Sequence, residues 1–180
     1  MARAVRPAVT LVELLIVTAI GGLLVLLVLA AAQTARTVAA CANHLHNLGL
    51  AYGQRVHLGH EAFQGRAAWV RELLPYTENQ RDLFGCPSDA NRPVVLSSYG
   101  INGRAQDFHA ADRPKVLLLD YQALVADAGD DWPTLVAPRH RGGLNVLFTD
   151  LSVKPVRSGD IDLQQPSRYQ QYWLPSAELP

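Results

Sequence analysis

Thr10-Leu-Val-Glu-Leu-Leu-Ile-Val-Thr-Ala-Ile-Gly-Gly-Leu-Leu-Val-Leu-Leu-Val-Leu-Ala-Ala-Ala32 is the stretch that decides the fold of this 180-residue chain. From Leu14 to Ala32 it holds nineteen residues without a charge, and Thr18 is the one polar side chain among them. A helix of that length measures about 28 Å, enough to cross the hydrocarbon core of a bilayer. The sequence therefore predicts a membrane-spanning segment rather than a simple soluble protein.

The residues before this stretch predict its orientation. Arg3 and Arg6 precede it, and the first acidic residue is Glu13. Positive charges ahead of a span hold that end in the cytoplasm, so we expect the rest of the chain to lie outside the inner membrane. Ala30 to Ala32 also offer a small-residue cleavage site, so a secreted protein that loses a signal peptide stays an alternative.

The helix is expected to continue beyond the membrane. No proline occurs between Pro7 and Pro75, and the sequence after Ala32 is rich in alanine, which favours helix. Apolar side chains then recur at spacings of three and four, which predicts one buried stripe made of Val38, Cys41, Leu45, Leu48 and Tyr52. We expect one helix over residues 9–58, spanning the membrane over about 9–32 and amphipathic beyond it.

Residues 59–180 are expected to form a globular head. A short helix is predicted over 67–75, and strands over 115–120, 144–149 and 153–156, the last pairing back on the one before it. The tail from Ser158 is expected to pack on the head as an ordered strap through its aromatic residues, Tyr169, Tyr172 and Trp173. The fold class expected is α+β, with the long helix packed on a small antiparallel sheet.

The charge composition argues against some classes of protein. Lys and Arg together number 16, as do Asp and Glu, so the formal net charge is zero. A balanced charge argues against a polybasic nucleic-acid binder and against an acidic disordered tail.

The segment Ala8-Val-Thr-Leu-Val-Glu13-Leu-Leu-Ile-Val17 resembles the leader junction of type IV pilins and type II secretion pseudopilins. The resemblance implies an eight-residue leader, cut by a prepilin peptidase between Ala8 and Val9, and N-methylation of Val9. Ala8 stands where the family has Gly, and Val9 where it has Phe. The resemblance also implies the pilin fold, with a long N-terminal helix on a small head.

Two interpretations of Glu13 stay open side by side. Thr10-x-x-Glu13 has the spacing of a capping box, in which the two side chains satisfy free N–H groups at a helix start. A carboxylate at the end of a membrane helix also seeks a cation. The resemblance implies that this cation is the free amine of Val9, in the same or a neighbouring subunit, so that Glu13 serves assembly.

The head resembles a pseudopilin-like subfamily whose members carry an H-x9-DG signature. Cys41-Ala-Asn-His-Leu-His-Asn-Leu-Gly-Leu-Ala51 is similar to its helix, and His140 and Asp150 keep the signature spacing. Leu151 replaces the Gly, and because Leu adopts positive φ only at a cost, we expect a wider turn here. His140 with Asp150 would be half of a catalytic dyad, but a structural role that locks strands together is favoured, since no nucleophile stands in a recognisable elbow.

The carboxylates of Asp127-Ala-Gly-Asp130-Asp131 are weak candidates for calcium, a cation that takes six to eight oxygen ligands. Major pseudopilins carry a calcium loop near the end of the head, as the resemblance implies. The spacing here is not that of an EF-hand, so a solvated acidic loop is favoured and no metal or cofactor is expected.

The two cysteines, Cys41 and Cys86, are expected to lie on the oxidising side of the membrane. A disulfide between them is favoured over two reduced, buried thiols.

Together these features predict a structural subunit rather than an enzyme. We expect a single-pass protein of the bacterial inner membrane, cytoplasmic at its N-terminus and periplasmic in its head. Its expected partners are other copies of itself, other pseudopilins, the prepilin peptidase and methyltransferase, and an inner-membrane assembly platform with its ATPase, which together build a secretion fibre. The alternative is a periplasmic enzyme or binding protein held by a plain signal anchor.

Overall fold

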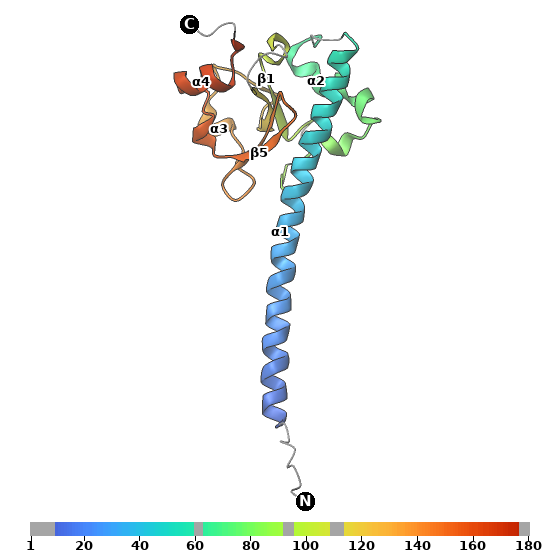
Figure 1. Cartoon of the computed structure of the whole chain (residues 1–180), viewed down its shortest axis with the longest axis vertical. Helices are drawn as coiled ribbons and strands as arrows, with labels where there is room; N and C mark the ends of the chain where they lie inside the picture. Colours follow the sequence, from blue (N-terminus) through green and yellow to red (C-terminus); the bar gives the residue numbers. More distant parts are fainter. Residues whose placement is uncertain (1–9, 60–62, 92–95, 109–113, 177–180) are drawn as a thin grey trace, which may run out of the picture. The chain divides into compact units, whose positions relative to one another are not determined.

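The computed structural model describes residues 10–59, 63–91, 96–108 and 114–176. Its longer elements are α1 (Leu11–His57), α2 (Trp69–Leu73), β1 (Tyr99–Asn102), β2 (Val116–Asp120), β3 (Val125–Ala126), α3 (Trp132–Leu135), β4 (Leu144–Phe148), β5 (Val153–Val156) and α4 (Pro166–Tyr172) (Figure 1). Short 3₁₀ turns lie between them: η1 (Arg66–Ala68), η2 (Leu74–Thr77), η3 (Arg81–Phe84), η4 (Ala105–Asp107) and η5 (Ser158–Asp160). The chain divides into two compact units, one up to Thr37 and one from Val38 onward.

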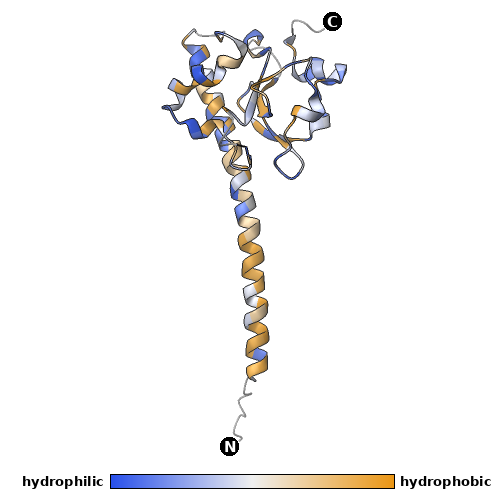
Figure 2. Cartoon of the chain, turned by 180° about the vertical axis from the view of Figure 1, so that it is seen from behind, coloured by the Kyte–Doolittle hydropathy of each residue, from blue (hydrophilic) through white to orange (hydrophobic). Residues whose placement is uncertain are grey.

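The first unit contains the apolar part of α1. This helix runs without a break for 47 residues, as the absence of proline predicted. Its N-terminal part is coloured hydrophobic in Figure 2, and its large side chains are exposed, from 52% at Ile16 to 74% at Leu11. By length and composition α1 can cross a bilayer, and none of its most apolar window is buried. The described residues of this chain do not shield these side chains from water, so they require lipid or another molecule to do so.

The second unit is built on a five-stranded sheet in the order β3-β1-β2-β4-β5. The pairs β1–β2, β2–β4 and β4–β5 are antiparallel, and β3 lies parallel to β1. The expected strands over 115–120, 144–149 and 153–156 are confirmed, and the α+β class with them. The expectation of a purely antiparallel sheet is wrong, because the chain reverses after β2 and places β3 on the far edge of β1.

Each face of the sheet carries its own core. On one face, Cys41, Leu45 and Leu48 of α1 pack with α2 and with the inward side chains of β1. On the other face, Trp132 of α3 and Trp173, which follows α4, pack with β2 and β4. Three residues of the predicted stripe, Cys41, Leu45 and Leu48, are thus buried, and its two ends, Val38 and Tyr52, are half-buried. The tail packs through its aromatic residues as expected, but as the helix α4 rather than as a strap.

The turn after β4 is tighter than expected. Leu151 adopts a φ of 64°, the conformation that a Gly would favour. The amide of Leu151 donates to the carbonyl of Phe148 over 2.9 Å, and that of Phe148 donates to Ser152 over 2.9 Å. The hairpin therefore keeps a short loop that ends in a left-handed residue, and Leu151 bears a strain of about 1–2 kcal/mol. The prediction of a wider turn is wrong.

Gly100 lies where the reversal after β2 passes closest to β1. A Cβ at this position would lie 2.8 Å from the carbonyl oxygen of Ala123 and 2.8 Å from the ring of Tyr121. The reversal is fixed by backbone bonds, including the one from Ile101 N–H to the Leu124 carbonyl at 3.0 Å. Because backbone atoms cannot turn aside as a side chain can, this crossing requires Gly.

We expect Gly100→Ala to lower the free energy of unfolding by about 1–3 kcal/mol, because the added methyl overpacks the crossing. Gly53→Ala is the matched control: a Cβ there meets nothing within 4 Å, and Ala favours helix over Gly by about 1 kcal/mol. Urea unfolding of the detergent-solubilised full chain, followed by tryptophan fluorescence, measures both. Equal stability of the Gly100→Ala variant and the wild type would show that this close approach does not require Gly.

Candidate functional site

The N-terminal end of α1 carries the capping box that the sequence predicted. The backbone N–H and the hydroxyl of Thr10 donate to Oε2 of Glu13 over 2.8 and 2.9 Å, and the amide of Glu13 donates back to Thr10 Oγ1 over 3.2 Å. The carboxylate is exposed. The capping interpretation of Glu13 is therefore confirmed. Ala8 and Val9, the expected cleavage and methylation positions, lie outside the described residues.

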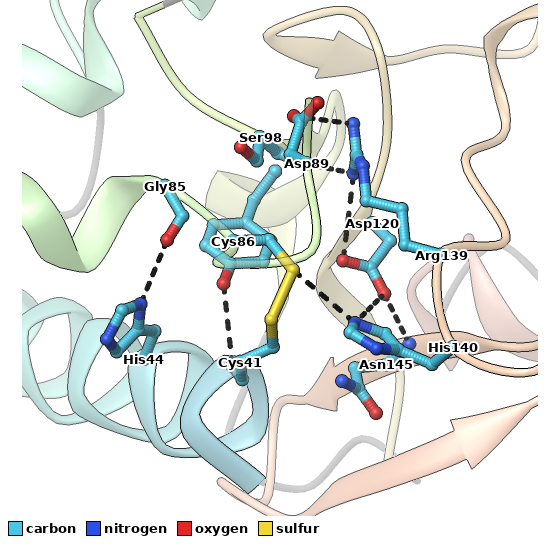
Figure 3. The surroundings of a disulfide bond; sticks show 11 residues. Cys41, His44, Gly85, Cys86, Asp89, Ser98, Asp120, Arg139, His140 and Asn145 are labelled. Carbon is cyan, nitrogen blue, oxygen red and sulfur yellow. Dashed lines mark hydrogen bonds and ion pairs between the residues drawn. A yellow bond between two sulfur atoms is a disulfide. The ribbon is translucent and has the colours of Figure 1, made fainter. Parts of the chain in front are cut away.

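A buried cluster in the second unit joins the two cysteines to several charged side chains. Cys41 and Cys86 form a disulfide, in agreement with the favoured expectation, and both residues are fully buried (Figure 3). Cys41 lies on the buried stripe of α1, and Cys86 follows η3. The bond therefore fixes the chain after η3 to α1.

His140 lies next to this disulfide, beside Cys86. Its Nε2 lies 3.5 Å from Cys86 Sγ and 3.5 Å from Asp120 Oδ2. A tight turn positions it: His140 and Gly143 exchange backbone hydrogen bonds of 3.2 and 2.9 Å, with positive φ at Arg141 and Gly142. That is the turn type that suits a two-residue hairpin loop.

Asp120 is the last residue of β2 and is fully buried. Its Oδ2 accepts the amide of Asn145 over 2.7 Å, and its Oδ1 lies 3.7 Å from the Arg139 guanidinium. Burial raises the pKa of Asp120 to about 7, although Asn145 and Arg139 act in the opposite direction. Burial, and then the charge of Arg139, lower the pKa of His140. The contact between His140 and Asp120 is therefore not a simple ion pair at neutral pH.

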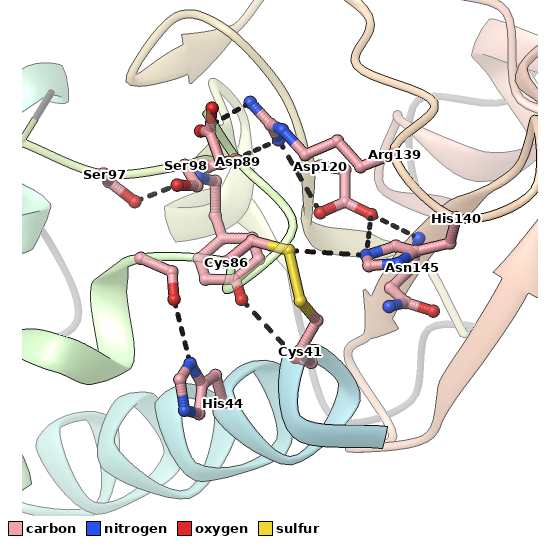
Figure 4. Close-up of polar contacts among 12 residues, drawn as sticks. Cys41, His44, Cys86, Asp89, Ser97, Ser98, Asp120, Arg139, His140 and Asn145 are labelled. Carbon is pink, nitrogen blue, oxygen red and sulfur yellow. Dashed lines mark hydrogen bonds and ion pairs between the residues drawn. A yellow bond between two sulfur atoms is a disulfide. The ribbon is translucent and has the colours of Figure 1, made fainter. Parts of the chain in front are cut away.

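Arg139 connects this cluster to the loop after η3. Its guanidinium lies 2.9 Å from Asp89 Oδ2 and donates to the carbonyl of Ser98 over 2.7 Å (Figure 4). These interactions hold the strand β2, the loop that contains Cys86 and the turn before β4 in one arrangement. The sulfur that faces His140 is already bonded to Cys41, so the cluster has no free thiol to activate in this state.

Asp150 lies in the turn between β4 and β5. Its Oδ1 accepts from the amide and the hydroxyl of Ser152 over 3.0 and 2.6 Å. Burial raises the pKa of Asp150, but the hydrogen bonds from Ser152 and the charge of Lys154 together outweigh it and hold the pKa below its usual value. His140 instead faces Asp120, so the signature pair does not form the dyad that its spacing suggested.

The acidic loop uses its carboxylates for internal bonds. Asp130 Oδ2 accepts from the Tyr121 hydroxyl over 2.8 Å and from the Asp127 amide over 2.9 Å, and Asp131 Oδ2 accepts from the Thr134 hydroxyl over 2.5 Å. Within the described ranges, Asp127, Asp130 and Asp131 do not gather into a metal-ligating group. The preference for a solvated loop over a calcium site stays a prediction.

The side chains around His140 were not predicted from the sequence. Asp120 ends a strand far from His140 in the sequence, and Arg139 and Asn145, although close to His140 in the chain, form no recognisable motif with it. One signal was present: Asp120 directly follows four apolar residues of a strand, where a charged side chain requires a buried partner.

Comparisons with known proteins add no assignment to these observations. No protein-family model, no curated protein and no solved structure matches this chain.

Proposed function

We propose that this chain is a structural subunit of the pseudopilin type, without enzymatic activity. It is cut after Ala8, N-methylated at Val9 and held in the bacterial inner membrane by α1, with its head in the periplasm. It then polymerises with copies of itself and other pseudopilins into a fibre for type II-like protein secretion. The prepilin peptidase, which also methylates, and an assembly platform with its ATPase are its partners.

The observation that carries this proposal is the exposed apolar part of α1, which begins at a capped carboxylate. Residues such as Leu11 and Val28 are 74% and 67% exposed. At about 25 cal/mol per Å² of apolar surface, such a helix is stable only in lipid or against other apolar helices. A fibre built from copies of α1 provides the second environment, and the membrane provides the first.

The carboxylate of Glu13 supports the assembly role. It stands among exposed apolar side chains, and its described bonds are to Thr10 of its own chain. When such a helix packs among its copies, an ionised carboxylate needs a cation nearby. The N-terminal amine released by cleavage before Val9 supplies that cation.

The disulfide supports the proposed periplasmic location of the head. Disulfides persist on the oxidising side of a membrane and are rare in the cytoplasm. With Arg3 and Arg6 on the cytoplasmic side, Cys41 and the rest of the second unit are expected in the periplasm.

The N-terminal mass of the protein tests the processing step. We expect a chain that begins at N-methylated Val9 when the protein is recovered from membranes of a host with a prepilin peptidase. A chain that begins at Met1 or Ala2 would show that Ala8 is not accepted. A chain that begins just after Ala32 would show a secreted, soluble head.

Glu13→Gln separates the two roles of Glu13. A capping box works with Gln as well as with Glu, so this variant keeps the cap and loses the charge. We expect at least a tenfold loss of sheared or cross-linked fibre, because the amine of Val9 is left without its carboxylate. The amount of membrane-inserted, disulfide-bonded chain stays that of the wild type.

Thr10→Ala is the matched control for this variant. It removes the cap, at about 0.5–2 kcal/mol of helix stability, and keeps the charge. We expect it to assemble. Normal assembly of Glu13→Gln together with failure of Thr10→Ala would show that Glu13 only caps the helix.

A pocket favours a second candidate, a periplasmic binding protein held by a plain signal anchor. It measures about 560 Å³, within the usual range for small-molecule sites, and is lined by Val70, Arg71, Leu74, Arg81, Phe84 and Leu96 among others. An uncut chain that stays monomeric with or without the Glu13→Gln change would support this candidate over the fibre subunit.

A further inference from the structure

The cluster around the disulfide brings together three side chains of types that bind metal ions. Sγ of Cys41, Sγ of Cys86 and Nε2 of His140 all lie within 4.8 Å of one another, and all three residues are buried. They come from three separate parts of the chain: α1, the loop after η3 and the turn before β4. Among the described residues, this is the group in which three or more side chains of ligating type gather so closely.

The distances around His140 match those between neighbouring ligands of a tetrahedral zinc ion. Zn–S bonds of about 2.3 Å and Zn–N or Zn–O bonds of about 2.0 Å place a sulfur about 3.6 Å, and an oxygen about 3.3 Å, from a ligating nitrogen. Nε2 of His140 lies 3.5 Å from Cys86 Sγ and 3.5 Å from Asp120 Oδ2. One imidazole nitrogen thus already faces a sulfur and a carboxylate at ligand spacing.

Two buried polar atoms of these side chains have no hydrogen bond among the described residues. Oδ1 of Asp120 and Nδ1 of His140 are buried and have no hydrogen-bond partner within the described structure. The Asn145 amide donates to Oδ2 of Asp120 over 2.7 Å and the Arg139 guanidinium lies 3.7 Å from Oδ1, so both orient the carboxylate as outer groups around a metal do.

We propose that the reduced chain binds one Zn²⁺ through Cys41, Cys86 and His140, with Asp120 as the fourth ligand. Two thiolates and an imidazole are a donor set that zinc prefers. Zinc and the disulfide exclude each other, because both use the same two sulfur atoms. The redox state of the cysteines therefore decides whether a covalent bond or a metal ion fixes the Cys86 loop to α1.

The exchange between the two states balances. A dithiol or phosphine reductant delivers two electrons to the disulfide, which takes up two protons to give two thiols. Zn²⁺ then replaces those two protons on the sulfur atoms. In the reverse direction, a disulfide oxidant accepts two electrons from the bound thiolates, the Cys41–Cys86 bond forms and Zn²⁺ leaves.

The test uses the full chain in detergent micelles, unfolded in urea with a phosphine reductant and refolded with Zn²⁺ or Co²⁺. We expect one Zn²⁺ per reduced chain and none bound by the oxidised chain. Co²⁺ should give the intense visible bands of a tetrahedral site and a thiolate charge-transfer band. X-ray absorption at the zinc edge should show two sulfur neighbours, with nitrogen or oxygen completing the site.

Substitutions identify the ligands. We expect His140→Gln and Asp120→Asn each to weaken Zn²⁺ binding by at least about tenfold, because each removes a ligand and even loss of an outer partner costs about 10–100-fold. His46→Gln is the matched control, since His46 is exposed on α1 and its Nδ1 contacts the Leu151 carbonyl at 3.3 Å. It should bind Zn²⁺ as the wild type does.

The inference is overturned by any of three results. A reduced wild-type chain that refolds and takes up no Zn²⁺ excludes the site. Equal affinity of His140→Gln and wild type excludes the imidazole ligand. The third result concerns a reduced chain that does not refold without metal. If it also fails to refold with Co²⁺ and shows no thiolate charge-transfer band, the site is excluded as well. None of these readings depends on fibre assembly.

Discussion

Loss of the Cys41–Cys86 disulfide is expected to lower the free energy of unfolding by about 4 kcal/mol. The bond closes a loop with a sequence separation of 45, and in the chain-entropy model a loop of that size restricts the unfolded state by this amount. The closed loop contains the part of α1 from Cys41 to His57 together with α2. Loss of the disulfide therefore releases two elements that both contribute to the core around Cys41, Leu45 and Leu48.

The measurement is urea unfolding of the full chain in detergent, with and without a phosphine reductant and with a metal chelator present. The three tryptophans, Trp69, Trp132 and Trp173, are buried in the second unit, so their fluorescence follows its unfolding. The Cys41→Ala/Cys86→Ala double variant should match the reduced wild type and should not respond to reductant. Reduced and oxidised chains of equal stability would contradict the prediction.

Arg139→Met is expected to cost about 3–5 kcal/mol. Arg139 is the cation between two carboxylates, 2.9 Å from Asp89 Oδ2 and 3.7 Å from Asp120 Oδ1, whose side chains are 6% and 0% exposed. Removing one partner of a buried ion pair leaves the other charge without compensation, which is strongly destabilising. The carbonyl of Ser98 also loses one of its two donors and keeps the amide of Tyr121 at 3.3 Å.

Arg141→Met, at an exposed arginine two residues further on, is the matched control and should change stability by less than about 0.5 kcal/mol. Adding Asp120→Asn to Arg139→Met should restore part of the loss, because one of the uncompensated charges is removed. Stability of Arg139→Met equal to that of Arg141→Met would show that the network contributes nothing.

The pH dependence of this cost has a defined sign. The pKa of Asp120 is raised to about 7 in the folded chain, above its ordinary value of 3.8. The stabilisation that this group provides by binding a proton is complete below pH 3.8 and is lost as the pH rises through 7. At pH 5 the folded carboxyl is neutral and needs Arg139 less, so the cost of Arg139→Met should be smaller at pH 5 than at pH 8.

Local patterns made the helix and three strands predictable. An uninterrupted run without proline and a stripe at spacings of three and four are properties of neighbouring residues, and both are sufficient to define α1. The strands β2, β4 and β5 are apolar runs bounded by turn residues, which the same kind of reasoning detects. The capping box is equally local, since Thr10 and Glu13 are three residues apart.

Interactions between distant segments explain what the sequence did not reveal. The strand β1 contains Gly100 and ends in Asn102, so its pattern is weak, and β3 has only two residues. The pairing of His140 with Asp120 depends on the order of strands in the sheet, which brings β2 beside β4. The spacing between His140 and Asp150 pointed to the wrong carboxylate, because Asp150 is engaged in its own turn.

The position of Cys41 on α1 has a mechanical consequence. A pull transmitted along α1 from its N-terminal part reaches Cys41 four residues into the second unit and can pass through the sulfur–sulfur bond directly to Cys86. The residues between them then lie outside the shortest covalent path and carry little of the tension. In the subunit that we propose, a helix drawn out of the membrane would load this covalent bond, and the part of α1 after Cys41 would be protected from being pulled off the sheet.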